Sequence, residues 1–340
     1  MNLYRVIVCF FCINVGFKWV SNAQSTAGFS DYFELSSEQV LKGDLLSGAM
    51  EIDFNSKGEL YILDRQQLAI IVYDQELVER NRFGQKGSGP GEFRRPIDLY
   101  IGEDDIVYVL DVGLRRISIF SASGDFLNSY IVEKPYMDLV EIDDYLCAHT
   151  GAIVPLADDN TVQCFNKLNG KAEVDFLPPT LAIAGKMLSY SNASFSTIQT
   201  TGQLLVALSH PLDGKVRIVN SEGKVQQIFK IDNAIFKQPE IPDSYNIQSH
   251  NIKDYATSMI HGIYVAKGML IAVYVELGTG IKYVDLFDLE GNRKLEKPIR
   301  FEKRYPVYAD ENGALYSFSY TEDKEGLKLK KYRYKGRIGK

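Results

Sequence analysis

The stretch at residues 97–130, IDLYIGEDDIVYVLDVGLRRISIFSASGDFLNSY, carries the clearest structural pattern in this sequence. It holds four short apolar or alternating segments separated by turns rich in Gly, Asp and Ser, a pattern typical of short β-strands. Residues 50–84, MEIDFNSKGELYILDRQQLAIIVYDQELVERNRFG, align with it closely. Asp64 and Asp111 take the same place in the two stretches, so we interpret them as copies of one four-stranded repeat.

Weaker copies of this repeat follow at residues 139–177, 195–231, 262–299 and 305–336. Six copies at a spacing of roughly 40 to 65 residues predict an all-β fold, a six-bladed β-propeller of four-stranded antiparallel blades. The last copy lacks an obvious fourth strand. We expect the N-terminal segment DYFELS, residues 31–36, to supply it, which closes the ring and covers a sheet edge.

The repeats predict one domain over residues 24–340, and residues 1–23 are expected to be a signal peptide. Within the domain, we expect blades near residues 50–93, 94–136, 137–180, 190–232, 260–301 and 302–337. At the N-terminus, Arg5 precedes the apolar run VIVCFFCINVG, and SNA offers a cleavage site. The run is shorter than the roughly 20 residues that span a membrane.

We therefore expect an exported protein, periplasmic, on the cell surface or extracellular, with no transmembrane segment after cleavage. An uncleaved membrane anchor, or lipid attachment at Cys9 or Cys12, is the alternative. Only Cys147 and Cys164 remain in the mature chain, and they could form a disulfide across a hairpin or be two small buried side chains. The net charge of −6 argues against nucleic-acid binding.

The glycine-rich segment that precedes residues 97–130 carries a family resemblance. It comprises Gly84, Gly87, Gly89, Pro90, Gly91, Phe93 and Pro96, and is followed by IVYVLD up to Asp111, RRISIF over residues 115–120, and Gly124. This series resembles the NHL-repeat propellers, and the whole chain is similar to six-bladed propellers exported by Bacteroidetes-type bacteria. The resemblance implies a fold but no activity. The Asn usual after the repeat's Asp is missing here.

The same glycine-rich segment is not expected to bind phosphate. A phosphate loop opens a helix, so that the helix N-terminus faces the anion, whereas FGQKGSGPGEF at residues 83–93 leads through Pro96 into a strand. It also lacks the Gly-Lys-Ser/Thr ending. We interpret the segment as a connector between blades, in which glycine permits left-handed backbone conformations.

The candidate functional residues lie on one face of the predicted propeller. With strands A to D counted outward from the axis, the B–C turns and the D–A links share that face, here called the B–C face. Arg65, Arg94 and Arg95 are expected there and could bind an anionic ligand or pair with Glu92 or Asp98. Asp64 and Asp111 are expected chiefly to cap their turns, although Asp111 is kept as a candidate ligand contact.

The histidines also map near the B–C face. The long link over residues 232–259 suggests a packed lid. The expected ligand-binding set is Arg65, Arg94, Arg95, Asp111, His149, His210, Tyr245, His250 and Glu276. If a metal such as Ca²⁺ or Zn²⁺ is present, His149, His210, His250 and His261 are its expected ligands.

These features favour a monomeric binding protein for an unknown glycan, peptide or protein ligand, with no cofactor and no catalytic residue assigned. Rigid blades that carry variable loops suit recognition. The alternative is a lactonase-like propeller hydrolase or lyase with a metal in the central channel. The sequence contains no Gly-x-Ser-x-Gly elbow and no HExxH motif.

Overall fold

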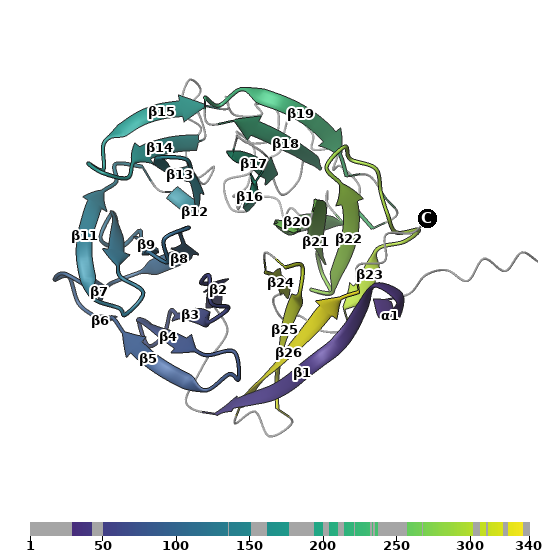
Figure 1. The fold of residues 1–340 in the computed structure, drawn as a ribbon, viewed down its shortest axis with the longest axis horizontal. Coiled ribbons are helices and arrows are strands. Elements are labelled where there is room, and N and C mark those ends of the chain that lie inside the picture. The colour runs from purple at the N-terminus through teal and green to yellow at the C-terminus, as the bar shows by residue number, and fades with distance from the viewer. Residues whose placement is uncertain are drawn as a thin grey trace, which may run out of the picture.

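The chain forms a closed ring of six four-stranded antiparallel sheets around a central axis (Figure 1). The computed structural model describes residues 29–42, 50–134, 136–150, 162–176, 194–199, 204–209, 214–220, 222–231, 233, 235–236, 257–266, 268–301, 307–310, 312–321 and 326–335. The predicted fold, a six-bladed β-propeller, is confirmed.

Each blade uses four strands, A to D, from the axis outward. Blade 1 contains β2 (Met50–Phe54), β3 (Leu60–Asp64), β4 (Ala69–Tyr73) and β5 (Glu79–Phe83). Blade 2 contains β8 (Pro96–Ile101), β9 (Val107–Asp111), β10 (Arg116–Phe120) and β11 (Phe126–Ile131). Blade 3 contains β12 (Tyr136–Ile142), β13 (Tyr145–Thr150), β14 (Val162–Asn166) and β15 (Ala172–Phe176).

The second half of the ring follows the same plan. Blade 4 contains β16 (Ser194–Gln199), β17 (Leu204–Ser209), β18 (Lys215–Asn220) and β19 (Val225–Lys230). Blade 5 contains β20 (Ser258–Ala266), β21 (Met269–Glu276), β22 (Lys282–Asp288) and β23 (Ile299–Phe301). Blade 6 contains β24 (Val307–Ala309), β25 (Leu315–Tyr320), β26 (Gly326–Tyr334) and β1 (Phe33–Lys42).

An N-terminal strand closes the ring, as expected. β1 pairs antiparallel with β26, and in Figure 1 it lies along the outside of that strand. Its bounds differ from the predicted residues 31–36, because Phe29–Tyr32 form one short helical turn, α1, and the strand extends to Lys42. A bulge between Leu35 and Ser37 interrupts the alternation of side chains, which explains why the sequence pattern ended too early.

The hydrophobic core lies between neighbouring blades. Every residue of β3 and β4 is buried, whereas the outer strand β5 is mostly exposed. Leu63 and Ile70 of blade 1 pack with Val107 and Phe120 of blade 2 in one cluster, and similar clusters lie between other blades. A strand covered on both faces reads as a continuous apolar run, which is the pattern seen in LYILD and AIIVY.

Cys147 and Cys164 are joined by a disulfide in the structure. They lie directly opposite each other on β13 and β14, and both side chains are buried. The bond therefore links two adjacent strands of blade 3.

The glycine-rich segment packs as a connector on blades 1 and 2. Two short strands, β6 (Gln85–Lys86) and β7 (Glu92–Phe93), pair in parallel within it. The buried guanidinium of Arg116 donates to the carbonyls of Gly89 and Glu92, each at 2.7 Å. Gly84 has a φ of 83°, and a Cβ there would lie 2.3 Å from the Phe93 ring. Carbonyl groups of the glycine-rich segment accept hydrogen bonds from Arg116, so the segment is not arranged as a phosphate-binding loop.

None of the helices found in the described part of the chain has the length and apolar character needed to cross a membrane.

Candidate functional site

Three carboxylates take equivalent positions on the innermost strands of three consecutive blades. Glu51 of β2 lies opposite Leu63, Asp98 of β8 lies opposite Leu110, and Asp138 of β12 lies opposite His149. Each partner is the penultimate residue of its B strand. The three carboxylates therefore lie at one level of the channel wall, near the B–C face.

Asp98 and Asp138 help to join neighbouring blades at the channel wall. The Oδ2 of Asp98 accepts a hydrogen bond from the backbone N–H of Leu139 at 2.7 Å, which ties blade 2 to blade 3. Asp138 Oδ1 accepts from the same N–H at 3.1 Å, and the two carboxyl side chains also interact. Burial raises the pKa of Asp98 to about 6, although these hydrogen bonds oppose the shift.

Glu51, unlike Asp98, accepts no hydrogen bond from the described backbone of a neighbouring blade. Its carboxylate lies 2.9 Å from Nη2 of Arg65, which comes from the B–C turn of blade 1 and also donates to the Ile97 carbonyl at 2.5 Å. The Glu51 side chain is 32% exposed, since an innermost strand borders the channel. Enclosure by the ring raises its pKa to about 8, with the Asp98 charge adding to the shift and Arg65 opposing it.

Arg65 also has unused hydrogen-bonding capacity. Its Nε is buried and has no hydrogen-bond partner among the described residues. A buried donor left unpaired costs free energy, about 1–3 kcal/mol, unless a ligand or a water supplies an acceptor. The Arg65 side chain is nevertheless 32% exposed, so its guanidinium is able to bind an acceptor oxygen while still paired with Glu51.

On the other side of the ring, Lys282 and His261 form a second pair. Lys282 begins β22 and is only 4% exposed, and its Nζ lies 2.6 Å from Nε2 of His261 on β20. Within the described residues, Lys282 makes no ion pair with a carboxylate. Burial lowers its pKa to about 7, opposed by the charge of Glu51.

His261 lies at the bulge of β20 between Ile260 and Gly262, and its side chain is exposed. Enclosure by the surrounding blades and the adjacent Lys282 charge both lower the pKa of His261 to about 3. The imidazole is therefore neutral at pH 7, and its Nε2 can accept a hydrogen bond from the Lys282 ammonium group.

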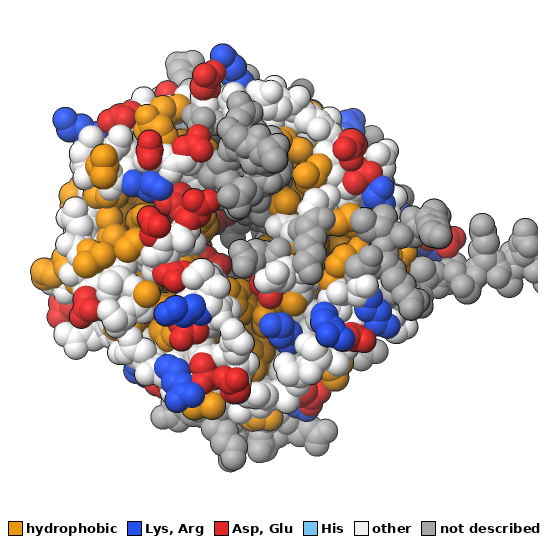
Figure 2. All heavy atoms as spheres, viewed as in Figure 1, with side chains coloured by type: hydrophobic (Ala, Val, Ile, Leu, Met, Phe, Trp, Pro, Cys, Tyr) orange, Lys and Arg blue, Asp and Glu red, His pale blue; other side chains and the backbone are white. Residues whose placement is uncertain are grey.

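Lys282 and Glu51 interact electrostatically across the channel. The charge of Lys282 lowers the pKa of Glu51, and Glu51 raises that of Lys282. The phenol of Tyr264 on β20 is influenced by Glu51 and Asp138, from blades 1 and 3, and its pKa is raised mainly by burial. We call Glu51, Arg65, Asp98, Asp138, His261 and Lys282 the channel cluster. Figure 2 shows the central opening from one face, with acidic side chains beside it over blades 2 and 3.

The three arginines that were predicted to lie together are found in two different places in the structure. Arg65 belongs to the channel cluster, whereas Arg94 and Arg95 are exposed, and neither guanidinium bonds to a described residue. Their suggested partners are engaged elsewhere. Glu92 accepts from the Gly89 N–H at 2.7 Å, and Asp98 accepts from blade 3.

Asp111 serves as a turn cap. Its fully buried carboxylate accepts the backbone N–H groups of Arg94 at 2.7 Å, Arg95 at 3.0 Å and Leu114 at 2.9 Å. Asp64 caps the equivalent turn of blade 1 through the N–H groups of Gln66 and Gln67. The capping interpretation of both residues therefore agrees with the geometry, and no ligand contact is needed to explain them.

The remaining candidates are scattered. His149 is buried on β13, opposite Asp138, and Glu276 at the end of β21 accepts a hydrogen bond from Thr279. His210, Tyr245 and His250 lie outside the described residues, as does the expected signal peptide. In the part of the chain that is described, no three His, Cys, Asp or Glu side chains are arranged to hold a metal ion.

The sequence analysis did not select Glu51, Asp138 or Lys282 as site residues, and it considered Asp98 only as a partner for the arginines. The equivalent positions of Glu51, Asp98 and Asp138 in blades 1 to 3 are visible only in the structure. Bulges after Pro96 and after Tyr136 shift β8 and β12 by one residue, so equal positions in space have unequal spacing in sequence. The signal available was an acidic residue near the start of each inner strand.

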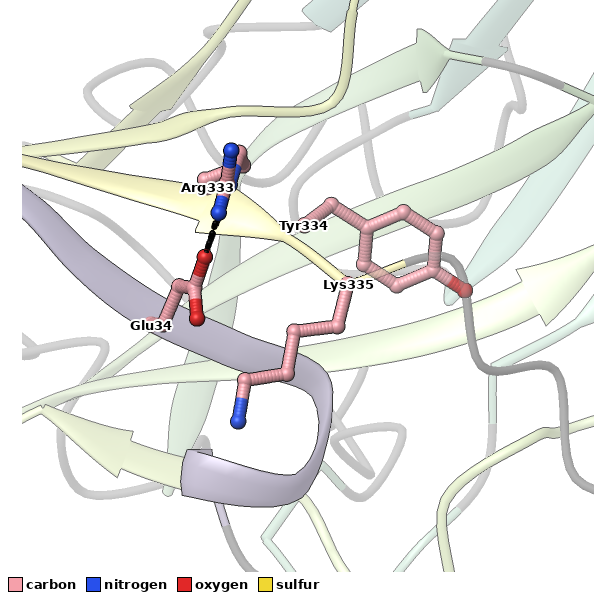
Figure 3. A pocket seen from close by; sticks show the side chains of 4 residues that line it. All are labelled: Glu34, Arg333, Tyr334 and Lys335. Atoms are coloured by element: carbon pink, nitrogen blue, oxygen red, sulfur yellow. Dashed lines mark hydrogen bonds and ion pairs between the residues drawn. The ribbon is translucent and has the colours of Figure 1, made fainter.

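A surface pocket lies far from the axis, where β1 meets β26 (Figure 3). Glu34, Arg333, Tyr334 and Lys335 line it. Arg333 Nε donates to Glu34 at 2.7 Å, and Lys335 Nζ donates to the Ser30 carbonyl at 2.6 Å. Arg333 and Glu34 thus pair with each other, and Lys335 binds the backbone next to the closing strand, so the pocket is a weaker candidate site than the channel cluster.

Comparisons with known proteins agree with the fold. A family model described as a six-bladed β-propeller, DUF5128, matches residues 42–148. No curated protein matches the sequence significantly. The resemblance to Bacteroidetes-type six-bladed propellers is confirmed by this model and by the solved structures that follow.

Three crystal structures illustrate the likeness. A DUF4221 member from Bacteroides vulgatus is 13% identical, with a TM-score of 0.64, over 90% of this chain and 99% of that one. A candidate exported protein from Bacteroides fragilis is 15% identical, with a TM-score of 0.59, over 91% and 97%. Virginiamycin B lyase from Staphylococcus aureus is 12% identical, with a TM-score of 0.54, over 88% and 99%. At these identities the likeness is one of fold.

Proposed function

We propose that this chain is an exported binding protein that takes a small polar ligand at the channel cluster. The observation that carries the proposal is the convergence of ionisable side chains from blades 1, 2, 3 and 5 on one level of the channel. Asp98 and Asp138 are used to join blades, but Lys282 and the Nε of Arg65 have no such use among the described residues. Groups with shifted pKa values that gather in a concave site commonly mark a functional one.

The chemistry of the cluster favours a ligand with acceptor oxygens and hydroxyl groups, such as a glycan or a peptide end. Lys282 and Arg65 are donors that can bind a carboxylate or carbonyl oxygen. Glu51 is able to bind a hydroxyl group on the opposite side of the ligand. Export is supported by the likeness to a candidate exported Bacteroides protein and by the apolar run at residues 6–16.

The test is binding of acidic oligosaccharides and short peptides, measured by calorimetry after an array screen. We expect Arg65→Met and Lys282→Met each to weaken binding at least about tenfold, the effect of losing roughly 1.4 kcal/mol. Arg94→Met and Lys171→Met are the matched controls, because both side chains are exposed, and they should bind normally. A folded protein that binds nothing on the arrays, or equal losses in the controls, contradicts the proposal.

A metal-assisted lyase is the second candidate. It is supported by the exposed His261 in the channel wall and by the fold shared with virginiamycin B lyase. The described residues supply no three-ligand metal site, so this candidate needs ligands from outside them, for which the sequence offers His210 and His250 together with His261. Elemental analysis of the purified protein decides the matter, since this candidate requires about one bound Ca²⁺ or Zn²⁺ per chain.

A further inference from the structure

We infer that Asn169 is a site of spontaneous covalent modification, at which the side-chain amide is hydrolysed and an aspartyl or isoaspartyl residue remains. The inference is independent of the proposed function and concerns the outer part of blade 3. Its basis is an exposed Asn-Gly turn in which the side-chain oxygen of the asparagine already accepts a hydrogen bond from a backbone N–H.

The sequence contains two Asn-Gly pairs, Asn169-Gly170 and Asn312-Gly313. Such pairs favour this reaction, because a glycine has no side chain to keep its backbone nitrogen away from the asparagine carbonyl carbon. Both asparagines are exposed turn residues, the first between β14 and β15 and the second between β24 and β25. In both turns the glycine N–H donates to an earlier backbone carbonyl at 2.8 Å. This bond must open before the nitrogen attacks, which costs little in an exposed turn, and it restrains both sites alike.

The two side-chain amides differ in their surroundings. Oδ1 of Asn169 accepts a hydrogen bond from the backbone N–H of Lys171 at 2.7 Å. None of the described residues donates to the side-chain oxygen of Asn312, whose backbone N–H instead donates to the carboxylate of Asp310 at 3.0 Å. Attack on the amide carbon places negative charge on its oxygen, so a donor already in position lowers the barrier, whereas a nearby carboxylate raises it. Asn169 is therefore the more reactive of the two.

The reaction balances with water as the only other reactant. The backbone nitrogen of Gly170 attacks Cγ of Asn169, the bond from Cγ to the side-chain nitrogen breaks, and ammonia leaves with the proton of the Gly170 N–H. Water then opens the resulting cyclic imide at one of its two carbonyls. Opening at the side-chain carbonyl gives an aspartyl residue, and opening at the main-chain carbonyl gives an isoaspartyl residue, whose main chain is one atom longer. No oxidant or reductant takes part.

The isoaspartyl product is expected to weaken the contact between blades 2 and 3. Gly170 has a φ of 69°, and a Cβ at this position would collide with the Tyr130 ring of β11. The Tyr130 hydroxyl donates to the Lys167 carbonyl of the same turn, and its ring belongs to the core cluster between the two blades. A main chain lengthened by one atom cannot keep Gly170 against this ring while the turn retains its hydrogen bonds.

The experiment compares the two turns within one molecule. The full-length mature protein is incubated at neutral and mildly alkaline pH, either folded or unfolded in urea, and peptide mapping by mass spectrometry measures conversion at positions 169 and 312. In the folded protein we expect position 169 to react at least about fivefold faster, an effect smaller than that of a donor in a buried oxyanion hole. In urea the two rates should become nearly equal, because the Lys171 N–H is no longer held at Oδ1.

Two variants test the effect on the contact between the blades. Aged natural protein enriched in the isoaspartyl form should unfold at a lower urea concentration than fresh protein, whereas aged Asn169→Gln should not, since glutamine forms the corresponding ring far more slowly. Asn169→Asp is the matched control for the added charge and should unfold like the fresh protein. Nearly equal rates at the two positions in the folded protein, or a rate ratio that unfolding leaves unchanged, overturn the inference. An equal loss of stability in aged Asn169→Gln overturns the effect on the blades.

Discussion

At the scale of single residues, a few buried polar side chains determine where the loops lie. Asp111 and Arg116 are both buried, and between them they bind backbone groups of the connector and of a B–C turn. Backbone groups held in this way fix a loop without regular secondary structure. Their removal is therefore expected to affect the connector more than the strands.

Asp111→Ala removes the acceptor for three backbone N–H groups, from Arg94, Arg95 and Leu114. We expect the free energy of unfolding to fall by about 2 kcal/mol, since charge-assisted hydrogen bonds are lost and donors remain unpaired. Urea unfolding followed by fluorescence measures it. Asp104→Ala, at an exposed position in the same blade, should change the stability by less than about 0.5 kcal/mol.

Arg116→Lys keeps the charge but cannot reach both the Gly89 and Glu92 carbonyls with one planar fork. We expect residues 84–93 to become several-fold more susceptible to limited proteolysis, with little change in the rest of the chain. The control is Arg115→Lys, because Arg115 is exposed and, within the described residues, its side chain donates to the Glu133 carbonyl alone. Unchanged cleavage in Arg116→Lys would show that the guanidinium does not hold the connector.

At the scale of elements, the pairing of β1 with β26 joins the two ends of the ring. Phe33 and Leu41 of β1 are buried, while Glu38 pairs with Lys328 at 2.7 Å. The strand thus has a buried face and a charged face, and it covers an edge that would otherwise pair with other chains.

A protein that lacks residues 29–42 is expected to aggregate, because β26 then becomes an exposed edge strand. A synthetic peptide of residues 29–42 should bind it and restore a monomer, as measured by light scattering and size-exclusion chromatography. The same peptide with Leu41→Asp is the control and should fail, since Leu41 lies in the core between blades 6 and 1. A monomeric truncated protein would contradict the expectation.

The disulfide within blade 3 is expected to stabilise the folded protein. It joins residues 17 apart in sequence, and a loop of this size corresponds to about 3 kcal/mol in the chain-entropy account. The double variant Cys147→Ala, Cys164→Ala should lose about this amount in urea unfolding. A reductant should destabilise the natural protein but not the double variant; a response in both would point to another cause.

The strands could be predicted from sequence more fully than the contacts between them. LYILD and VYVLD predict buried strands, because both faces of a blade are covered by neighbours. The end of β1 could not be predicted, since the bulge at residues 35–37 depends on β26, which lies about 300 residues away. The equivalence of Glu51, Asp98 and Asp138 could not be predicted for the same reason, because β8 and β12 contain bulges that depend on their partner strands.

At the scale of the whole molecule, the channel cluster depends on the closed ring. Lys282 could not be identified from IKYVDLF, where a lysine at the start of a strand is typical of an exposed edge. Its Nζ contacts His261 of the same blade, and its electrostatic partner Glu51 belongs to blade 1. Arg94 and Arg95 are the opposite case. They follow a conspicuous glycine-rich motif in the sequence, but their side chains are exposed on the surface.

The pH dependence of overall stability should report on Glu51. Its pKa is about 8 in the folded protein, above the ordinary value of 4.5, so folding takes up a proton between these pH values. This contribution to stability is present below pH 4.5 and is lost as the pH rises through 8. Glu51→Gln removes it, so the variant should gain stability relative to the natural protein between pH 5 and pH 9.

The measurement is urea unfolding of both proteins across that range. Glu103→Gln is the matched control, because Glu103 is exposed on the surface of blade 2, and its stability difference should stay constant with pH. A constant difference for Glu51→Gln as well would mean that its carboxyl group titrates normally in the ring.

The seam between β1 and β26 has a consequence for biosynthesis. β1 precedes all the other strands of the ring in the chain, whereas its partner β26 follows them. During synthesis β1 is therefore without its partner until the strands of all six blades have been made. A product that stops before β26 keeps an open ring with two unpaired strand edges, which favours its removal by proteases. Ring closure thus tests whether the propeller is complete, because only a chain with all six blades can cover these edges.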